Sequence, residues 1–447
     1  MKLVCSGVVK ENLKSGISLN ISQIKRNKHI KAIFNKTASN MLDFIGLPDA
    51  DRKNIIKTIE TGSRIKKKFK NFVVLGIGGS ALGVKLLKDT FIDSINKDIG
   101  INIYVCDNID SDSFVSLLNK LDLKKTCFNI ITKSGTTSET LSQMMIVVNR
   151  YKKRKIDFAK HLVITTTEGN SLYNFAIRNN IETFTIPVGV GGRFSILSPV
   201  GLLPASVMGI SVEALLEGAK VAKENAMNND INNFAYTCAH IAYSYLKAGK
   251  SNLVVMPYSE RLRLFPDFFA QLWGESLGKK DNRQGEEIFA GQTPIKAVGV
   301  TDQHSQLQLY SEGVKDKLIM FVTVENPSFD EEVVDDLGLG KHLKGASLKT
   351  LLNYEYQSTA FALTKNDRPN FTISIESISE KTIGELIFMS ELMTAFMGEM
   401  MDINAFDQPG VELSKIYTKA CLKHPGMSSA EKEIKSFIAN SKMFTIK

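Results

Sequence analysis

The chain has 447 residues, of which 43% are hydrophobic and 23% are charged. This is the composition of a globular protein, and the length predicts two or three domains rather than one core. The net charge is +9, but Lys and Arg are dispersed apart from short runs at 66–70 and 152–155. Such runs are typical of solvated helix faces, not of a nucleic-acid site, and a mildly positive field favours acidic small substrates.

The positions of the cysteines, histidines and apolar residues narrow the class of protein further. The five cysteines are scattered without a CxxC pair, which predicts reduced thiols in a cytosolic protein. The six histidines have no metal-ligand spacing, so no metal is expected. The N-terminus and the rest of the chain lack an apolar run of membrane-spanning length. We therefore expect a cytoplasmic protein that is neither exported nor anchored in a membrane.

The first predicted elements form a helical lead and an α/β domain. Residues 1–44 are assigned to an N-terminal helical lead, and the polar helical pattern continues to about residue 70. Short runs rich in Ile and Val then alternate with helical segments, as in a parallel sheet covered by helices on both faces. The runs begin at Phe72, Ile101, Phe128, Leu162 and Thr183. This first domain is predicted to span residues 45–210.

A second, less regular α/β series follows a helical stretch at 212–247. Its strand-like runs begin at Asn252, Ile295, Lys317 and Phe371, which predicts a second domain over residues 211–381. From residue 382 onward, apolar residues recur at helical spacing without a convincing strand. Residues 382–447 are therefore predicted to be a helical arm that packs across the two domains.

Two runs, FVVLGIGGSALG at 72–83 and NIITKSGTTSET at 129–140, have the same layout. Each is an apolar strand, then a loop rich in Gly, Ser and Thr, then a helical pattern, which directs backbone N–H groups and hydroxyls at an anion. In the first loop, glycines such as Gly79 permit tight turns, and Ser80 can cap the next helix or contact the anion. Ala81 stands where a GxGxxG fingerprint needs glycine, so this loop alone indicates only a turn.

The second loop is more specific, because it offers four hydroxyls and one ammonium within six residues. These residues are Thr132, Lys133, Ser134, Gly135, Thr136 and Thr137. A helix cap would use one or two of the hydroxyls, whereas a phosphate would use most of them. No GxxxxGK[ST] pattern is present, so a phosphate monoester is preferred over a nucleoside triphosphate.

Candidate reacting groups stand far downstream. In PDFFAQLWGESLGK, Gln271 and Glu275 lie four apart on one face of an apolar helix, where desolvation would raise the pKa of Glu275 toward that of a general base. In VTDQHSQLQLYSEG, Asp302 is the expected N-cap, which places His304 in the first turn of a helix ending near Gly313. A helix N-terminus disfavours imidazolium and leaves a neutral His able to exchange protons.

Two further cations complete the set. In FDQPGVELSK, Pro409 starts a helix, and Gln408 and Lys415, seven apart, are expected on one face. In VGVGGRFSILSPVG, Arg193 follows two glycines at the expected carboxyl end of a strand, where it can pair with a carboxylate or face a developing oxyanion. Taken singly, each of these residues is more often structural than catalytic.

Together, GIGGS, TKSGTTSET, VGGRFS, GESLGK, TDQHSQ and FDQPGVELSK resemble the motifs of the glucose-6-phosphate isomerase family in its shorter bacterial form, in the family's order. The resemblance implies two sugar-isomerase α/β/α sandwich domains with parallel sheets and a C-terminal arm. It also implies a homodimer whose active site is shared between subunits, with the histidine entering from the partner chain. It implies no metal, no cofactor, no nucleic acid and no membrane partner.

The resemblance also assigns roles. Ser80 and residues 132–137 would hold the phosphate, while Gln271, Gln408 and the Gly79 backbone would contact the sugar. His304 and Lys415 would assist ring opening. Glu275 would move a proton between C2 and C1 of the hexose 6-phosphate through a cis-enediol(ate), which Arg193 would stabilise. Two alternatives stay open: a sugar-phosphate-binding regulator without chemistry, and a related isomerase that also accepts mannose 6-phosphate.

Overall fold

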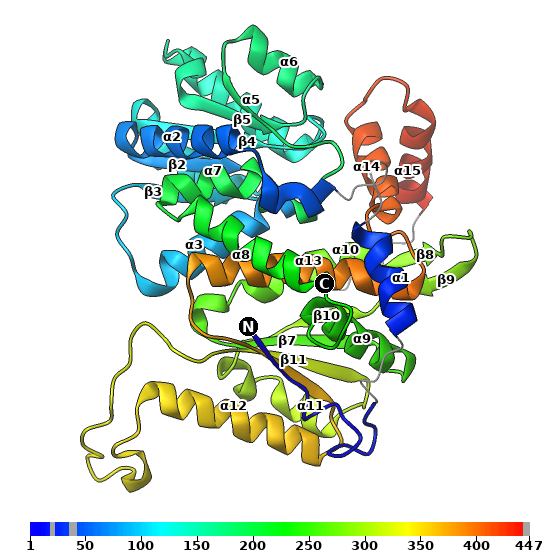
Figure 1. Ribbon diagram of the computed structural model, residues 1–447. Helices are drawn as coiled ribbons and strands as arrows, with labels where there is room; N and C mark the ends of the chain where they lie inside the picture. The colour runs from blue at the N-terminus through cyan, green and yellow to red at the C-terminus, as the bar shows by residue number, and fades with distance from the viewer. Residues whose placement is uncertain (18–22, 35–42, 441–447) are drawn as a thin grey trace.

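Two five-stranded sheets organise the chain, one above the other in Figure 1. The structure, a computed structural model, describes residues 1–17, 23–34 and 43–440. Parts of the predicted helical lead, at 18–22 and 35–42, and the end of the predicted arm, at 441–447, lie outside the described residues. Within the described ranges, no helix has the length and apolar character that crossing a bilayer requires.

The first sheet is entirely parallel, in the order β3-β2-β4-β5-β6. Its strands are β2 (Asn71–Leu75), β3 (Asn102–Cys106), β4 (Thr126–Ile131), β5 (Leu162–Thr166) and β6 (Glu182–Thr185). Each strand coincides with a predicted run, so the parallel α/β fold class is confirmed. β2, β4 and β5 are buried at every position, as continuous apolar runs in a doubly covered sheet require.

Alternation along the strands assigns the two faces of this sheet to different helices. Phe72 and Val74 point into the main core, whereas Val73 and Leu75 point into a separate cluster. The main-core side is covered by α2 (Arg52–Lys68), α3 (Leu82–Phe91) and α7 (Pro199–Met208). The opposite side is covered by α4 (Ser111–Lys120), α5 (Ser138–Lys153) and α6 (Ser171–Arg178).

The second sheet has the order β1-β12-β11-β7-β10. Its parallel strands are β7 (Asn252–Tyr258), β10 (Thr293–Lys296), β11 (Lys317–Val324) and β12 (Asn370–Ile375). β1 (Lys2–Val4) pairs antiparallel with β12, so the assignment of the first residues to a helical lead is wrong. Three residues show no periodicity, and the partner strand is distant in sequence. A hairpin of β8 (Lys279–Asp281) and β9 (Glu287–Ala290) was likewise not predicted.

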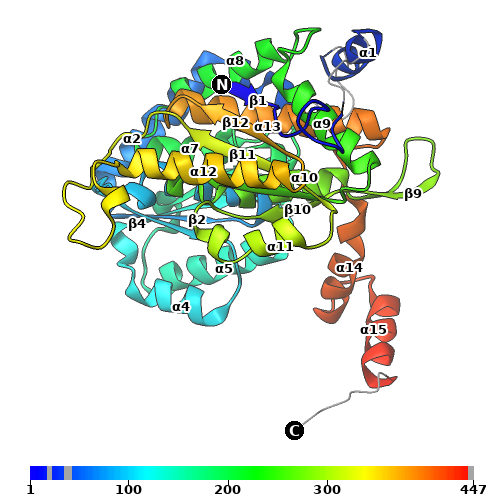
Figure 2. The same ribbon diagram turned by 90° about the horizontal axis from the view of Figure 1, so that it is seen from below.

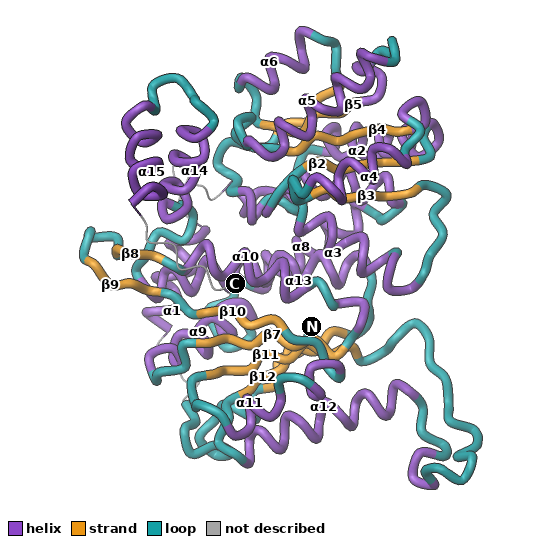
Figure 3. Tube along the Cα trace, turned by 180° about the vertical axis from the view of Figure 1, so that it is seen from behind, coloured by secondary structure: helices purple, strands orange, loops and turns teal. Residues whose placement is uncertain are grey.

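A layer of helices separates the sheets (Figure 3). It contains α8 (Val212–Asn225), α10 (Phe265–Leu277) and α13 (Glu380–Met401), with α9 (Phe234–Lys247) and α1 (Gln23–Phe34) beside it. α13 is apolar nearly all round and buried along most of its length, as a central helix should be. It crosses α8 so closely that a Cβ on Gly218 would lie 1.7 Å from the carbonyl oxygen of Lys381. The far face of the second sheet carries α11 (Leu307–Glu312) and α12 (Leu348–Lys365).

The last two described helices, α14 (Glu412–Cys421) and α15 (Ser428–Asn440), form a hairpin that stands away from the rest of the chain (Figure 2). Several of its apolar side chains are exposed, among them Leu413 at 62%, Ile416 at 41% and Ile438 at 58%. Of the segment predicted as an arm across the domains, only α13 packs between the sheets.

Candidate functional site

The two Gly/Ser/Thr-rich loops lie side by side at one edge of the first sheet. β2 and β4 are adjacent, and the chain leaves β2 toward β3 on one side and β4 toward β5 on the other. The loops at 76–80 and 132–137 therefore flank the topological switch point at the carboxyl ends of the strands. Open α/β sheets bind ligands at this point.

The first loop is pressed against the segment that carries Arg193. It turns at Gly78, which has a φ of +56°, and continues as the short helix η2 (Gly78–Ser80). A Cβ on Gly79 would lie 2.2 Å from the carbonyl oxygen of Gly192, so only glycine fits there. Ser80 does not cap α3, whose N-cap position is Ala81, and its hydroxyl has no hydrogen-bond partner within the described ranges. Of the two roles predicted for Ser80, capping of the helix is therefore excluded, and contact with an anion stays a prediction.

The second loop is closed on itself by its own hydroxyls. The Oγ1 atoms of Thr132 and Thr137 lie 2.7 Å apart, and Thr136 donates from Oγ1 to Ser134 Oγ at 3.0 Å. Thr137 occupies the N-cap position of α5 without making a cap hydrogen bond. The first amides of α5 are therefore left without a side-chain acceptor, as at other anion-binding helix termini.

Lys133 connects this loop electrostatically with Arg193. Burial lowers the pKa of the Lys133 ammonium, Asp43 opposes this shift, and the charge of Arg193 adds to it. The two cations are thus close enough for their charges to interact. A dianion placed between them would relieve that repulsion.

Arg193 itself is the centre of a buried hydrogen-bond network. It lies in η6 (Gly192–Phe194) and is only 4% exposed. It donates from Nε to Ser276 Oγ (2.6 Å), from Nη1 to Gln408 Oε1 (2.8 Å) and from Nη2 to the carbonyls of Ala405 (2.6 Å) and Asp407 (3.1 Å). Burial lowers the pKa of Arg193, while Glu275 and Asp407 raise it. One guanidinium therefore ties the end of α10 to the segment that contains Gln408.

Glu275 and Gln271 face the same space from α10, which begins at Phe265 with Pro266 in its first turn, as predicted. Gln271 donates from Nε2 to Glu275 Oε1 at 3.1 Å, which confirms that the two residues share a helix face. The same Nε2 atom lies 2.8 Å from where a Cβ on Gly78 would stand. The Glu275 side chain is 33% exposed, and its Oε2 lies 3.5 Å from Arg193 Nη1. The apolar side of α10 is buried and holds both polar groups in place.

Lys279 belongs to this network, although sequence reasoning did not select it. Its Nζ donates to the carbonyl oxygens of Glu275 (2.7 Å) and Asp407 (3.1 Å). Burial lowers the pKa of Lys279 from 10.5 to about 8, and Arg193 acts in the same direction. The available signal was its position four residues after Glu275, one helical turn along.

His304 is not brought to this network within one chain. It is the last residue of η8 (Thr301–His304), it is exposed, and no hydrogen bond joins it to another described residue. α11 begins only at Leu307, so the predicted placement of His304 in its first turn is wrong. Asp302 is not the N-cap because its carboxylate accepts hydrogen bonds from the Val298 amide (2.7 Å) and Ser305 Oγ (2.5 Å).

Lys415 is also separate from the network. It lies on the protruding α14, is exposed, and pairs with Glu412 at 2.7 Å. Gln408 precedes η10 (Pro409–Val411) in a non-helical conformation and points to Arg193. The prediction that Gln408 and Lys415 share one helix face is therefore wrong, because Gln408 lies before the helical residues and only Lys415 belongs to α14.

Fold and geometry define the class: a two-sheet α/β protein with paired anion-type loops at a switch point and a carboxylate–guanidinium pair beside them. Residues 21–441 match the phosphoglucose isomerase family, and the chain belongs to that family. It is 45% identical over 405 residues to the glucose-6-phosphate isomerase of Carboxydothermus hydrogenoformans, covering 88% of this chain and 87% of that one.

Two solved structures share the fold. A hypothetical protein from Thermus thermophilus superimposes with a TM-score of 0.82 at 36% identity, over 90% of this chain and 94% of that one. A glucose-6-phosphate isomerase from Chlamydia trachomatis shares the fold, with a TM-score of 0.78 at 22% identity over 93% of this chain and 81% of that one.

Proposed function

We propose that this protein is an aldose–ketose isomerase that interconverts glucose 6-phosphate and fructose 6-phosphate, a step of glycolysis and gluconeogenesis. The observation that carries the proposal is the contact between the Gly79 backbone and the Gly192–Arg193 segment. This contact joins the first loop to the segment of Arg193, whose Nη1 lies 3.5 Å from Glu275 Oε2. Membership of the phosphoglucose isomerase family supports the same reaction.

In this proposal the phosphate end of the substrate is the anchor. Ser80 and the loop 132–137 donate hydroxyl and amide hydrogens to the dianion, and Lys133 supplies a positive charge. Gln271, Gln408 and the Gly79 backbone contact the sugar. An anchored phosphate leaves C1 and C2 of the open-chain hexose to the groups around Arg193, so binding also orients the reacting atoms.

The chemical step is a proton shift that needs one base and one electrostatic stabiliser. Glu275 removes the proton from C2 of the aldose, which leaves a cis-enediol(ate), and returns it to C1, while the hydroxyl proton of O2 passes to O1, which gives the ketose. Arg193 faces the developing negative charge with a guanidinium that is already fixed, so little reorganisation accompanies the reaction. The reaction is a net isomerisation, and the carboxylate is regenerated in each turnover.

His304 and Lys415 are proposed to assist ring opening, with His304 supplied by a second copy of the chain. Within one chain both are exposed and neither contacts Glu275 or Arg193. A homodimer that brings His304 of one subunit to Glu275 of the other would complete the set. The uncovered apolar side chains of α14 and α15 supply surface for such an association.

We further propose that residues 45–210 and 211–381 act as two sugar-isomerase domains, that residues 382–447 connect them, and that the protein works in the cytoplasm. The cross-domain bonds of Arg193 to Ser276 and Gln408 support a site that needs both sheets in place. Neither domain alone would then turn over substrate.

The proposal is tested by supplying purified protein with fructose 6-phosphate and detecting glucose 6-phosphate through a coupled NADP-dependent dehydrogenase. Formation of glucose 6-phosphate supports it. Binding of fructose 6-phosphate without turnover would contradict it and would favour a regulator. The same assay is then started from mannose 6-phosphate, without and with an added enzyme that converts mannose 6-phosphate. Glucose 6-phosphate formed without that enzyme would show that the protein does not discriminate the stereochemistry at C2.

A further inference from the structure

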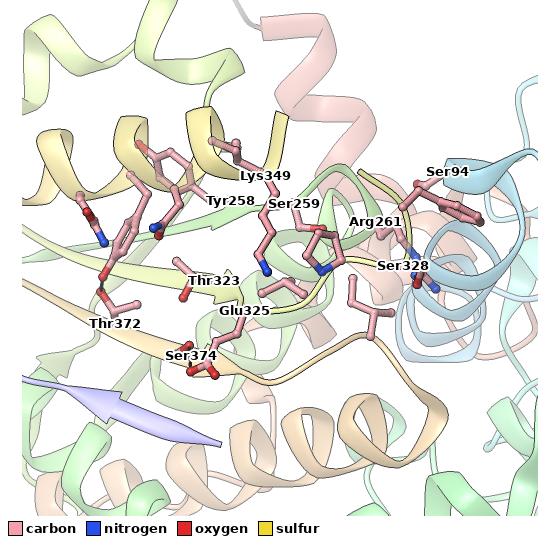
Figure 4. Close-up of a pocket in the computed structure, with 18 of the residues that line it drawn as sticks. Ser94, Tyr258, Ser259, Arg261, Thr323, Glu325, Ser328, Lys349, Thr372 and Ser374 are labelled. Carbon is pink, nitrogen blue, oxygen red and sulfur yellow. Dashed lines mark hydrogen bonds between the residues drawn. The ribbon is translucent and has the colours of Figure 1, made fainter. Parts of the chain in front are cut away.

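A second cavity lies at the end of the second sheet and shares no residue with the candidate site. It has a volume of about 650 Å³ and is lined by β7, β11, β12 and α12, with Ser94 and Ile95 from the first domain (Figure 4). A cavity of this size holds a sugar- or nucleotide-sized ligand. The cavity is separate from the paired loops. Gln271 of α10 lies next to Gly78, which precedes α3. Arg261, which precedes α10, instead donates to Thr90 at the other end of α3.

The topology of the second sheet repeats that of the first. In the second sheet, β7 lies between β10 and β11, and β12 lies beyond β11. In the first sheet, β2 lies in the same way between β3 and β4, and β5 lies beyond β4. The switch point of the second sheet therefore lies between β7 and β11. Residues that follow these two strands, including Ser259 and Ser328, line the cavity. It thus occupies, in the second sheet, the place that the phosphate-type loops occupy in the first.

Two cations, Arg261 and Lys349, line this cavity, with Glu380 acting on the charge of Arg261 and Lys349 acting on Asp330 from a distance. Arg261 lies in η7 (Glu260–Leu262) and donates to the Thr90 carbonyl at 2.9 Å and to Ser328 Oγ at 3.1 Å. Lys349 stands in the first turn of α12, where its Nζ donates a long hydrogen bond of 3.3 Å to Asn326 Oδ1 and its backbone amide donates to Asp330 Oδ1 at 2.9 Å. Among the described residues neither charged side-chain group has a carboxylate oxygen within 4.0 Å. In Figure 4 the Lys349 side chain extends toward the strand ends that carry Thr323 and Glu325.

The remaining walls complement these charges. The hydroxyls of Ser259 and Thr323 make no hydrogen bond within the described ranges and are free to bind a ligand. Leu352, Val324 and Tyr356 supply apolar surface. Glu325, the one carboxylate of the lining, is already neutralised by Lys2 at 2.8 Å. The cavity therefore offers net positive charge and free hydroxyls beside a flat apolar wall.

We propose that this cavity is a second binding site, for a phosphate monoester of a sugar or nucleoside. Arg261 and Lys349 hold the phosphate, Ser259 and Thr323 bond to ligand oxygens, and the ring of the ligand lies against Leu352 and Tyr356. The site does not depend on the proposed isomerase activity, because it uses none of the same residues.

Isothermal titration calorimetry with ribose 5-phosphate and with AMP tests this site on the full chain. The titrations use a Ser134→Ala/Thr136→Val background, in which the first-domain loops have lost two exposed hydroxyl contacts. We expect saturable binding of at least one ester, weakened about tenfold or more by Lys349→Met, as for loss of a charge-assisted hydrogen bond. Lys365→Met, at the other end of α12, is the matched control and should leave the affinity unchanged.

The possible results separate cleanly. Tighter binding of AMP identifies a nucleotide ligand, and equal binding of both esters identifies a sugar phosphate; either supports the site. Binding that Lys349→Met and Arg261→Gln leave unchanged would overturn it, as would no saturation at millimolar concentrations. Inorganic phosphate that binds as tightly as both esters would overturn the role of the apolar wall. Because Lys349 is exposed, its substitution leaves the fold intact.

Discussion

Arg193 and Glu275 face each other at 3.5 Å, measured from Nη1 to Oε2, which is longer than the other hydrogen bonds of that guanidinium. Arg193 is instead held by neutral acceptors: Ser276, Gln408 and two backbone carbonyls. The Arg193 guanidinium is thus held in place without a short ion pair to the Glu275 carboxylate. A base that must give and take a proton in each turnover needs this freedom, and a tight ion pair would remove it.

Replacing the proposed base tests the chemistry directly. Glu275→Gln keeps an oxygen that can accept from Gln271 but cannot take a proton, so we expect kcat to fall roughly 10²-fold or more with a small change in KM. Asp267→Asn, a half-buried carboxylate on the same helix that pairs with Lys296 at 2.7 Å, is the control and should retain activity. Near-normal kcat for Glu275→Gln in the coupled assay would exclude the assigned role.

Glycine at position 79 should be indispensable because the Gly192 carbonyl occupies the space of its side chain. Gly79→Ala should separate the first loop from Arg193, with a loss of about 1–3 kcal/mol in the free energy of unfolding and a large drop in kcat/KM. Gly192→Ala is the matched control, since its Cβ would meet nothing within 4 Å. Urea unfolding and the coupled assay on both variants check this, and equal effects would contradict it.

The buried Lys279 makes stability depend on pH on the alkaline side. Its pKa in the folded chain is about 8, below the ordinary 10.5, so between these values the unfolded chain binds the additional proton. Stability should therefore rise with pH across this window. Lys279→Met should lose that rise, whereas the exposed neighbour Lys280→Met should keep it. Urea unfolding at several alkaline pH values measures the slopes, and identical slopes for wild type and Lys279→Met would refute the argument.

Glu391 should have the opposite effect on the acidic side. Both of its carboxylate oxygens are buried without a hydrogen-bond partner among the described residues, and burial raises the pKa well above its usual value. The folded chain thus keeps a proton that the unfolded chain releases above about pH 4.3, so stability should fall as pH rises.

Glu391→Gln cannot titrate and should therefore gain stability relative to wild type, by a margin that grows from about pH 5 to about pH 7. Glu380→Gln on the same helix is the control. Thermal unfolding across this range measures the margin; one that stays constant with pH would show that Glu391 is not protonated in the fold.

A site shared between subunits predicts complementation. Glu275→Gln and His304→Ala should each have little activity, but co-expressed chains should regain activity, because a mixed dimer contains one site with both native residues. Arg193→Lys co-expressed with Glu275→Gln is the control and should stay inactive, since Arg193 and Glu275 come from one chain. Activity recovered in the control but not in the test pair would reverse the assignment.

Local patterns predicted the secondary structure well where strands are buried on both faces. All five strands of the first sheet coincide with predicted runs, and the three central ones, β2, β4 and β5, are buried at every position, which makes such strands mostly apolar. β1 and the β8–β9 hairpin were not predicted. β1 and β8 have three residues each, and β9 has four residues that are nearly all exposed, so none of them carries a buried or alternating pattern.

The sequence by itself determined the parallel α/β class, the paired loops and the identity of the polar residues, because these depend on residues close together in the chain. Tertiary structure alone decided which of them meet. Arg193, Glu275 and Gln408 come from segments separated by 82 and 133 positions, and a buried guanidinium with five donors joins them. His304 and Lys415 carry equally specific motifs yet lie outside that network, because η8 and the protruding α14 carry them where no hydrogen bond joins them to Arg193 or Glu275 within the described chain.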